Sequence, residues 1–170
     1  EKWCTHAGPG HWPDADMLPV GALRQDYDHS NWTKFTQDEQ ITMLSLWCMM
    51  RAPLIVGANL PQNDAFTLKL LTNPDILEIE RTAHCAHQLY RTENEVVWIA
   101  PRKDGKGIYL ALFNISEEDH EIVVDPDICG MEKMQHAKEL WTQSCYETDK
   151  KLSCIVKKHG AAVFHLTGTV

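Results

Sequence analysis

The sequence lacks the features that mark several classes of protein. No apolar run approaches the roughly 18 to 20 residues that span a bilayer, so we expect no membrane contact. Only 16 Lys and Arg stand against 24 Asp and Glu, giving a net charge of -8 without a dense basic cluster, which argues against a nucleic-acid partner. There is no internal repeat, no CxxC pair and no zinc-ribbon spacing. The chain also begins at Glu1 without an initiator Met or a signal-peptide pattern, which predicts a piece of something longer.

What is present is the composition of a folded domain. The 170 residues are 44% hydrophobic and 24% charged, a balance typical of globular proteins. A chain of this length buries roughly 70% of the surface that its unfolded form exposes. We therefore expect a proper core, in one medium domain or two small ones.

The six cysteines leave the redox compartment open. Cys48 lies in an apolar helical pattern and is expected to be a small buried hydrophobe. We interpret the cysteines as reduced thiols, which favours a cytoplasmic protein over a secreted one. The alternative is a disulfide between Cys145 and Cys154 within a hairpin. The short sequons at Asn31 and Asn114 favour secretion.

The chain up to about residue 82 has helical periodicity. Thr36 and Glu39 form a capping box, and the apolar residues that follow predict a buried helix that ends before Pro53. Residues 54–56, Leu-Ile-Val, are typical of a fully buried strand in a parallel sheet. Two further helices are expected over residues 65–71, capped by Asp64, and after Asn73-Pro74. Helix, buried strand and helix indicate part of an α/β layer or barrel.

From about residue 88 the hydrophobic period is two. Strands are predicted over 95–100 and 107–114, joined by a hairpin at Asp104-Gly105. Further strands are predicted over 121–124, 137–141, 152–156 and 161–166. Short strands separated by turns indicate an antiparallel sandwich, with Trp98 and Trp141 in its core.

The densest polar cluster occupies residues 5–18 and allows three interpretations. Asp14 and Asp16 are a possible pair of glycosidase carboxylates, although they would lie side by side rather than flank a sugar. His6 and His11 with both aspartates suit a divalent metal, but the spacing matches no specific metal pattern. The third interpretation, which we favour for Asp14, is that its side chain holds the loop through backbone amides.

Residues 7–18, AGPGHWPDADML, resemble a characteristic segment of the α-galactosidase / α-N-acetylgalactosaminidase family (glycoside hydrolase family twenty-seven, the melibiases). Three later stretches resemble that family in order and spacing. They are Glu39-Gln40 followed by Leu46-Trp47 and Ala52-Pro53-Leu54, then residues 73–79, then Leu140-Trp141-Thr142 with His159-Gly160-Ala161. The resemblance spans essentially the whole chain.

The resemblance implies a fold and a division of the chain. The family builds a (β/α)8 TIM barrel followed by an antiparallel β-sandwich, and the matching stretches cover only the last barrel units and the sandwich. We expect the barrel part over residues 1–82 and the sandwich over 83–170. The family's two catalytic aspartates would then precede Glu1, so we assign no catalytic residue here. The family's reaction requires no metal or organic cofactor.

The resemblance also implies site residues. In the family, the second Asp of the loop and the following Met line the galactose pocket, which transfers to Asp16 and Met17. Trp12 is a further candidate that would stack on a sugar face. His11, Pro13 and Ala15 depart from the commonest family residues, which indicates a divergent bacterial branch and leaves the substrate less defined than the fold.

Two functions are therefore carried forward. The first is the C-terminal part of a retaining glycosidase acting on terminal α-galactosides or α-N-acetylgalactosaminides, in contact with the missing N-terminal part or another chain. The alternative is a non-catalytic carbohydrate-binding or interaction module. Such a module usually presents a planar set of aromatic residues, which the spacing of Trp and Tyr here does not predict.

Overall fold

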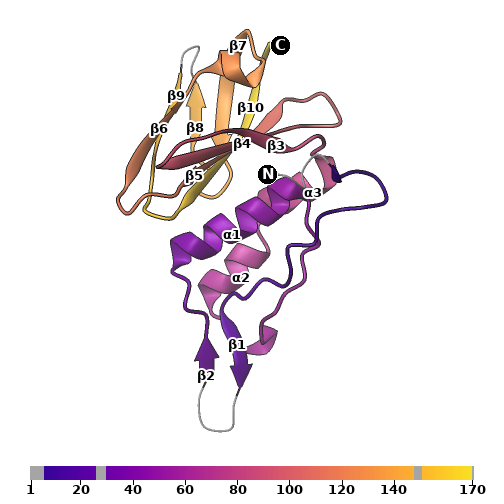
Figure 1. Cartoon of the computed structure of the whole chain (residues 1–170), viewed down its shortest axis with the longest axis vertical. Coiled ribbons are helices and arrows are strands. Elements are labelled where there is room, and N and C mark those ends of the chain that lie inside the picture. Colours follow the sequence, from indigo (N-terminus) through magenta and orange to yellow (C-terminus); the bar gives the residue numbers. More distant parts are fainter. Residues whose placement is uncertain (1–5, 26–29, 148–150, 170) are drawn as a thin grey trace.

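The computed structural model describes residues 6–25, 30–147 and 151–169. A helical layer lies against a β-sandwich, and a small hairpin extends from the helical layer at the far end of the molecule (Figure 1). The elements of the first half are β1 (Ala22–Gln25), β2 (Ser30–Trp32), α1 (Gln37–Met50), the 3-10 helix η2 (Leu60–Gln62), α2 (Ala65–Leu71) and α3 (Pro74–Thr82).

Helix α1 begins as its sequence predicts. Thr36 Oγ1 accepts a hydrogen bond from the Glu39 amide at 3.2 Å, and Glu39 Oε2 accepts one from the Thr36 amide at 2.8 Å. The capping box is thus confirmed. The helix ends at Met50, because Arg51 adopts the left-handed conformation with φ 56°. Helix α1 contacts α2 and α3 on one side and β4, β5 and β10 on the other, which explains why its apolar residues surround it.

The prediction of a fully buried strand at residues 54–56 is wrong for this chain. Only one parallel bridge forms, between Leu18 and Val56, with the Leu18 amide donating to the Ile55 carbonyl at 2.8 Å. Leu18 is fully buried, whereas Ile55 is 48% exposed. A parallel strand is buried when helices cover both faces and strands flank both edges. Among the residues that the structure describes, this segment has a neighbour on one edge alone.

The second half forms the sandwich. Its strands are β3 (His87–Arg91), β4 (Glu95–Pro101), β5 (Ile108–Asn114), β6 (His120–Val124), β7 (Lys133–Glu139), β8 (Cys145–Glu147), β9 (Leu152–Val156) and β10 (Ala161–Thr169), with the 3-10 helix η3 (Pro126–Cys129). One antiparallel sheet has the order β3-β4-β5-β10-β7-β8, and β6 pairs with β9 in a second sheet. The predicted strands are present, with β7 starting and ending earlier than expected.

The hairpin between β4 and β5 turns where the sequence predicts. Gly105 has φ 70°, and Asp104 Oδ1 accepts a hydrogen bond from the Lys106 amide at 3.1 Å. Gly107 has φ 106°, and a Cβ on it would lie 2.1 Å from the Leu166 carbonyl oxygen. The left-handed backbone favours glycine at position 105, and the close approach of Leu166 requires it at position 107.

The larger sheet is a middle layer with a core on each side. One core lies between the sheet and the helices and includes Leu44, Ile76, Trp98 and Val163. The other fills the sandwich between the two sheets and includes Leu112. All seven residues of β5 are buried, so both faces of this sheet are covered.

Some expectations about single residues are settled by these layers. Trp98 is 4% exposed but lies in the core between the larger sheet and the helices, so its predicted place inside the sandwich is wrong. Trp141 is only partly buried and packs against that same core. The described cysteines are free thiols, and Cys145 and Cys154 lie on β8 and β9, which pair with different strands. Cys4 lies outside the described residues.

Within the parts of the chain that the structure covers, no helix has the length and apolar character needed to cross a membrane.

Candidate functional site: the loop before Leu18

The loop over residues 6–17 leads into the buried bridge at Leu18. A tight turn shapes its first part, since Gly8 and His11 exchange backbone hydrogen bonds of 2.9 and 3.0 Å. Gly10 in this turn has φ 97°, a conformation that glycine adopts readily. Thr5, at the start of the predicted polar cluster, lies outside the described residues.

The two aspartates of the loop have different roles in its geometry. Asp14 Oδ1 accepts a hydrogen bond from the Asp16 amide at 2.9 Å, which confirms that Asp14 holds the loop through a backbone amide. Asp16 has φ 70°, a left-handed conformation that Asp tolerates better than most residues. Its Oδ1 accepts from the Met17 amide at 2.6 Å. The Asp16 side chain remains exposed.

Helix α1 and the segment after it fix the position of Asp16 and Met17. Trp47 Nε1, on α1, donates to the Asp16 carbonyl at 3.1 Å. The backbone of Gly57 passes so close that a Cβ on it would lie 3.1 Å from Met17 Cβ. The Met17 side chain is 55% exposed. Asp16 and Met17 therefore present an acceptor and an apolar surface side by side.

Trp12 is held by a cation. The guanidinium carbon of Arg51 lies 3.8 Å from the centroid of the Trp12 ring, and Arg51 Nε donates to the Glu80 carbonyl at 2.9 Å. Arg51 thus occupies one face of Trp12, so a sugar could stack only on the other. Burial raises the pKa of the Glu80 carboxyl to about 7, and the nearby positive charge of Arg51 opposes that rise.

The two sharper interpretations of the loop gain no support. Among the residues described, no group of three or more His, Cys, Asp or Glu is arranged to hold a metal ion, so His6, His11, Asp14 and Asp16 are not gathered as ligands. Asp14 and Asp16 are two residues apart on one loop, and Asp14 Oδ1 accepts a hydrogen bond from the Asp16 amide. Such neighbours do not flank a glycosidic bond, as a pair of glycosidase carboxylates must.

Three contributors to the site went unrecognised in the sequence. Trp47 and Arg51 belong to an apolar helix and its end, and Gly57 closes an apolar run. Their roles depend on a contact across the chain to the loop, which periodicity does not reveal. The one indication in the sequence was that Leu46-Trp47 belongs to a stretch that resembles the family.

Two family models together match most of the chain. Residues 1–82 match the model described as "Alpha galactosidase A", and residues 92–166 match "Alpha galactosidase C-terminal beta sandwich domain".

Individual relatives agree with this assignment. The chain is 32% identical to alpha-galactosidase D of Emericella nidulans, over 96% of this chain and 24% of that protein. It is 27% identical to alpha-galactosidase 2 of Arabidopsis thaliana, over 98% of this chain and 41% of that protein. The chain thus spans about a quarter to four tenths of the length of these relatives.

A solved structure gives the same result in three dimensions. The GH27 β-L-arabinopyranosidase of Geobacillus stearothermophilus superposes with a TM-score of 0.91 at 38% identity, covering 99% of this chain and 40% of that one. The fold is accordingly the last part of a (β/α)8 barrel followed by an antiparallel β-sandwich. This chain belongs to the GH27 alpha-galactosidase family of glycoside hydrolases, and what it matches is the C-terminal portion of that family.

Proposed function

We propose that the whole protein carrying this chain is a retaining glycoside hydrolase that removes terminal α-galactosyl or α-N-acetylgalactosaminyl residues. In this proposal the chain supplies one wall of the sugar pocket, and both catalytic carboxylates lie outside its 170 residues. Family membership supports the reaction class, and the relatives named alpha-galactosidase support the sugar.

The observation that carries the site is the presentation of Asp16 and Met17. Both side chains are exposed, while their backbones are fixed by Trp47 and by the Leu18–Val56 bridge. A fixed carboxylate accepts hydrogen bonds from sugar hydroxyls, and each such charge-assisted bond contributes roughly 1.5 to 3 kcal/mol. The thioether of Met17 supplies an adaptable apolar surface for the sugar ring.

In the proposed reaction, a carboxylate nucleophile attacks the anomeric carbon and the glycosidic bond breaks, while a second carboxyl protonates the leaving oxygen. Water then hydrolyses the glycosyl-enzyme, and the second group, now a carboxylate, takes a proton from that water. The residues of this chain take no part in the bond changes. Asp16 and Met17 orient the sugar so that its anomeric carbon meets the nucleophile, and correct orientation accounts for a large share of catalysis. Trp12, held by Arg51, would close the outer side of the loop.

The similarity to a β-L-arabinopyranosidase favours a second candidate substrate. β-L-Arabinopyranose has the ring configuration of α-D-galactopyranose without the C6 hydroxymethyl group. A wall that recognises ring hydroxyls would therefore accept both sugars. Comparing p-nitrophenyl α-D-galactopyranoside with p-nitrophenyl β-L-arabinopyranoside on the full-length protein decides between them.

Substitution of Asp16 tests the proposal in the full-length protein. We expect Asp16→Ala to lower kcat/KM about 100-fold, the scale of a charged contact in a closed pocket. Unchanged kinetics in a folded variant would rule out the sugar contact.

Asp16→Asn separates binding from loop structure. Asn keeps an oxygen for the Met17 amide and tolerates the left-handed backbone, but it removes the charge. If Asp16 binds sugar, Asn also lowers kcat/KM substantially. Full activity in Asp16→Asn combined with loss in Asp16→Ala would show that the residue only shapes the loop.

A further inference from the structure

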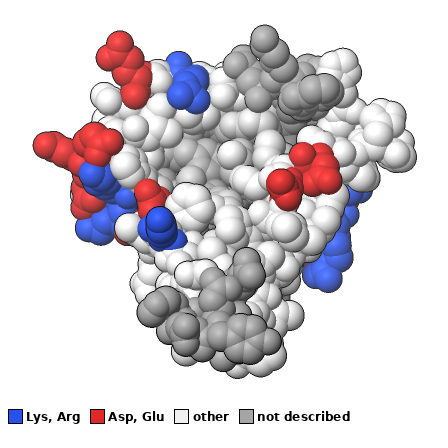
Figure 2. Space-filling view, turned by 60° about the horizontal axis from the view of Figure 1, so that its bottom comes forward, with Lys and Arg blue, Asp and Glu red and all other residues white. Residues whose placement is uncertain are grey.

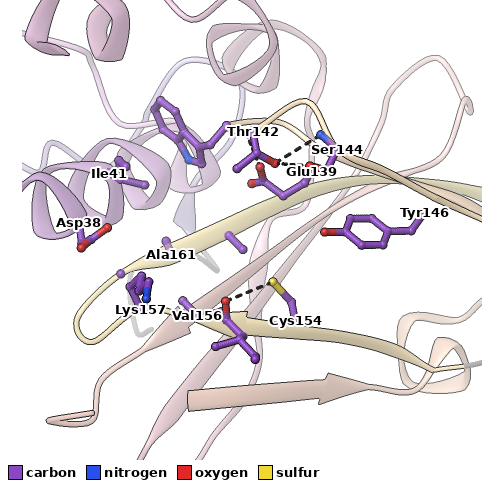
Figure 3. Close-up of a pocket in the computed structure, with 14 residues that line it drawn as sticks. Asp38, Ile41, Glu139, Thr142, Ser144, Tyr146, Cys154, Val156, Lys157 and Ala161 are labelled. Carbon is purple, nitrogen blue, oxygen red and sulfur yellow. Dashed lines mark hydrogen bonds between the residues drawn. The ribbon is translucent and has the colours of Figure 1, made fainter. Parts of the chain in front are cut away.

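A concave site lies on the sandwich side of α1. It is a cavity of about 300 Å³, within the size range of small-molecule sites, bounded by the start of α1, the end of β7, β8, β9 and the start of β10. Figure 3 shows Asp38 and Ile41 on the helix side, and Thr142 and Ser144 facing Val156 across the cavity. Asp16 contacts α1 near its other end, through Trp47.

The base of the cavity offers an open strand edge. Val163 directs both its backbone groups toward β7, because its amide donates to Glu139 Oε1 at 3.1 Å and its carbonyl accepts from Leu140 at 2.7 Å. Successive residues of a strand direct their backbone N–H and C=O groups to opposite edges. Ala161 is two residues before Val163, so both of its backbone groups also face the β7 edge of β10. Strand β7 pairs with β10 only from Phe164 onward. Neither group of Ala161 has a partner among the residues that the structure describes.

The walls combine aromatic and hydroxyl groups. Trp141 lines the cavity with its indole held in place, since Nε1 donates to Ser45 Oγ at 2.9 Å. Tyr146 is 42% exposed, and its ring lies 6.1 Å from that of Phe164. In Figure 3 the Tyr146 hydroxyl points toward the interior of the cavity. The hydroxyls of Thr142 and Ser144 lie 3.0 Å apart in the segment between Trp141 and Tyr146.

We propose that this cavity binds one pyranose unit of an oligosaccharide, as a second, non-catalytic sugar site. A sugar ring has apolar C–H faces, which suit Trp141 and Tyr146, and equatorial hydroxyls that both donate and accept. The open backbone edge of Ala161 and the hydroxyls of Thr142 and Ser144 provide matching donors and acceptors. Two carboxylates, those of Asp38 and Glu139, line the cavity, and Lys157, the one lysine among its described lining residues, is bonded to Asp119 at 2.6 Å. The lining therefore favours a neutral ligand over an anion. The choice of a saccharide rests on the proposed function, whereas the cavity itself does not.

Lactose titration of the full-length protein by calorimetry tests this site. The galactosyl linkage of lactose is β, so the hydrolysis proposed above leaves the probe intact. We expect saturable binding that Tyr146→Ala weakens about tenfold, since the aromatic wall is lost. Ser144→Leu, which fills the mouth, should abolish it. Ile128→Ala, on η3 and similarly exposed at 46%, serves as the matched control and should leave it unchanged.

Three results would overturn the site: no lactose binding, binding equally strong in folded Tyr146→Ala and Ser144→Leu, or occupation of the cavity by an apolar dye but not by lactose. The proposed function fails separately. A protein that binds lactose in a Tyr146-dependent way but hydrolyses neither p-nitrophenyl glycoside keeps this site and contradicts the catalytic proposal.

Discussion

Asn114 shows how a sequence motif acquires a different meaning in the fold. Its Nδ2 lies within 2.7 to 3.1 Å of three backbone carbonyls, those of Glu118, Val156 and Lys157. Its Oδ1 accepts from the amide and the hydroxyl of Ser116. The side chain is buried, so in the folded protein this sequon has no accessible amide for a glycan. The hydrogen bonds of Asn114 therefore join the end of β5 to the turn after β9. A sequon buried in this way does not indicate secretion.

Glu80 should make stability depend on pH. Its carboxyl has a pKa raised to about 7 by burial, compared with 4.5 when exposed, and among the residues that the structure describes its Oε1 has no hydrogen-bond partner. Between these values the unfolded chain is ionised while the folded chain keeps the proton, so stability falls as pH rises from 4.5 to 7. We expect Glu80→Gln to stabilise the protein more at pH 8 than at pH 5, as measured by urea unfolding.

Glu93→Gln provides the comparison, because Glu93 is exposed on the turn before β4. Its effect on the free energy of unfolding should be small and equal at both pH values. If the free energies of unfolding of Glu80→Gln and of the unmodified protein differ by the same amount at both pH values, Glu80 is not the source of the pH dependence.

At the scale of elements, Asn73 joins the helical layer to the sandwich. Its Oδ1 caps α3 by accepting from the amides of Asp75 and Ile76, and its Nδ2 donates to the Leu140 carbonyl at 3.1 Å. We expect Asn73→Ala to lower the free energy of unfolding by about 2 kcal/mol, from the lost cap and the lost buried hydrogen bond.

Asn73→Ser separates these contributions, because Ser is a good cap but cannot reach Leu140. It should cost about half as much as Asn73→Ala in the same unfolding experiment. Equal losses in the two variants would show that the contact with Leu140 contributes little.

The elements also show what a sequence can reveal. Helix caps at Thr36, Asp64 and Asn73 were predictable because each acts within one turn of the chain. Strand β8 was not, because it is only three residues long, buries none of them, and is ordered by its pairing with β7. The loop at Asp16 was recognised through its resemblance to a family. Its anchors Trp47 and Arg51 were not, because they depend on contacts about 30 and 40 residues apart in the chain.

At the scale of the whole molecule, the first half of the chain leaves several large apolar side chains exposed, two of them beside the residues of the Leu18–Val56 bridge. Met17 and Ile55 are about half exposed, and so are Trp32 and Phe35. In Figure 2, which brings the end with β1 and β2 forward, the charged side chains lie mainly on the left and right, and uncharged described residues fill much of the area between them. Contact with the rest of the protein, or with another chain, would cover such a surface.

This surface gives a direct test. We expect the 170-residue chain alone to bind an apolar fluorescent dye and to self-associate in sedimentation, and the full-length protein to do neither. Ile55→Ser should reduce dye binding by the isolated chain, whereas Leu68→Ser, at similar exposure on α2, should reduce it less. A monomeric chain that unfolds cooperatively without binding dye would contradict the expectation.

The double burial of β5 bears on how such proteins can be divided and recombined. Helices cover one face of the larger sheet, and β6 and β9 cover the other. The strands of this sheet therefore contribute side chains to two cores, one on each face. A gene fusion that transferred the sandwich without α1 would expose Trp98 and Val163 to water. Recombination that preserves folding must therefore move the last helices together with the sandwich, as one heritable unit.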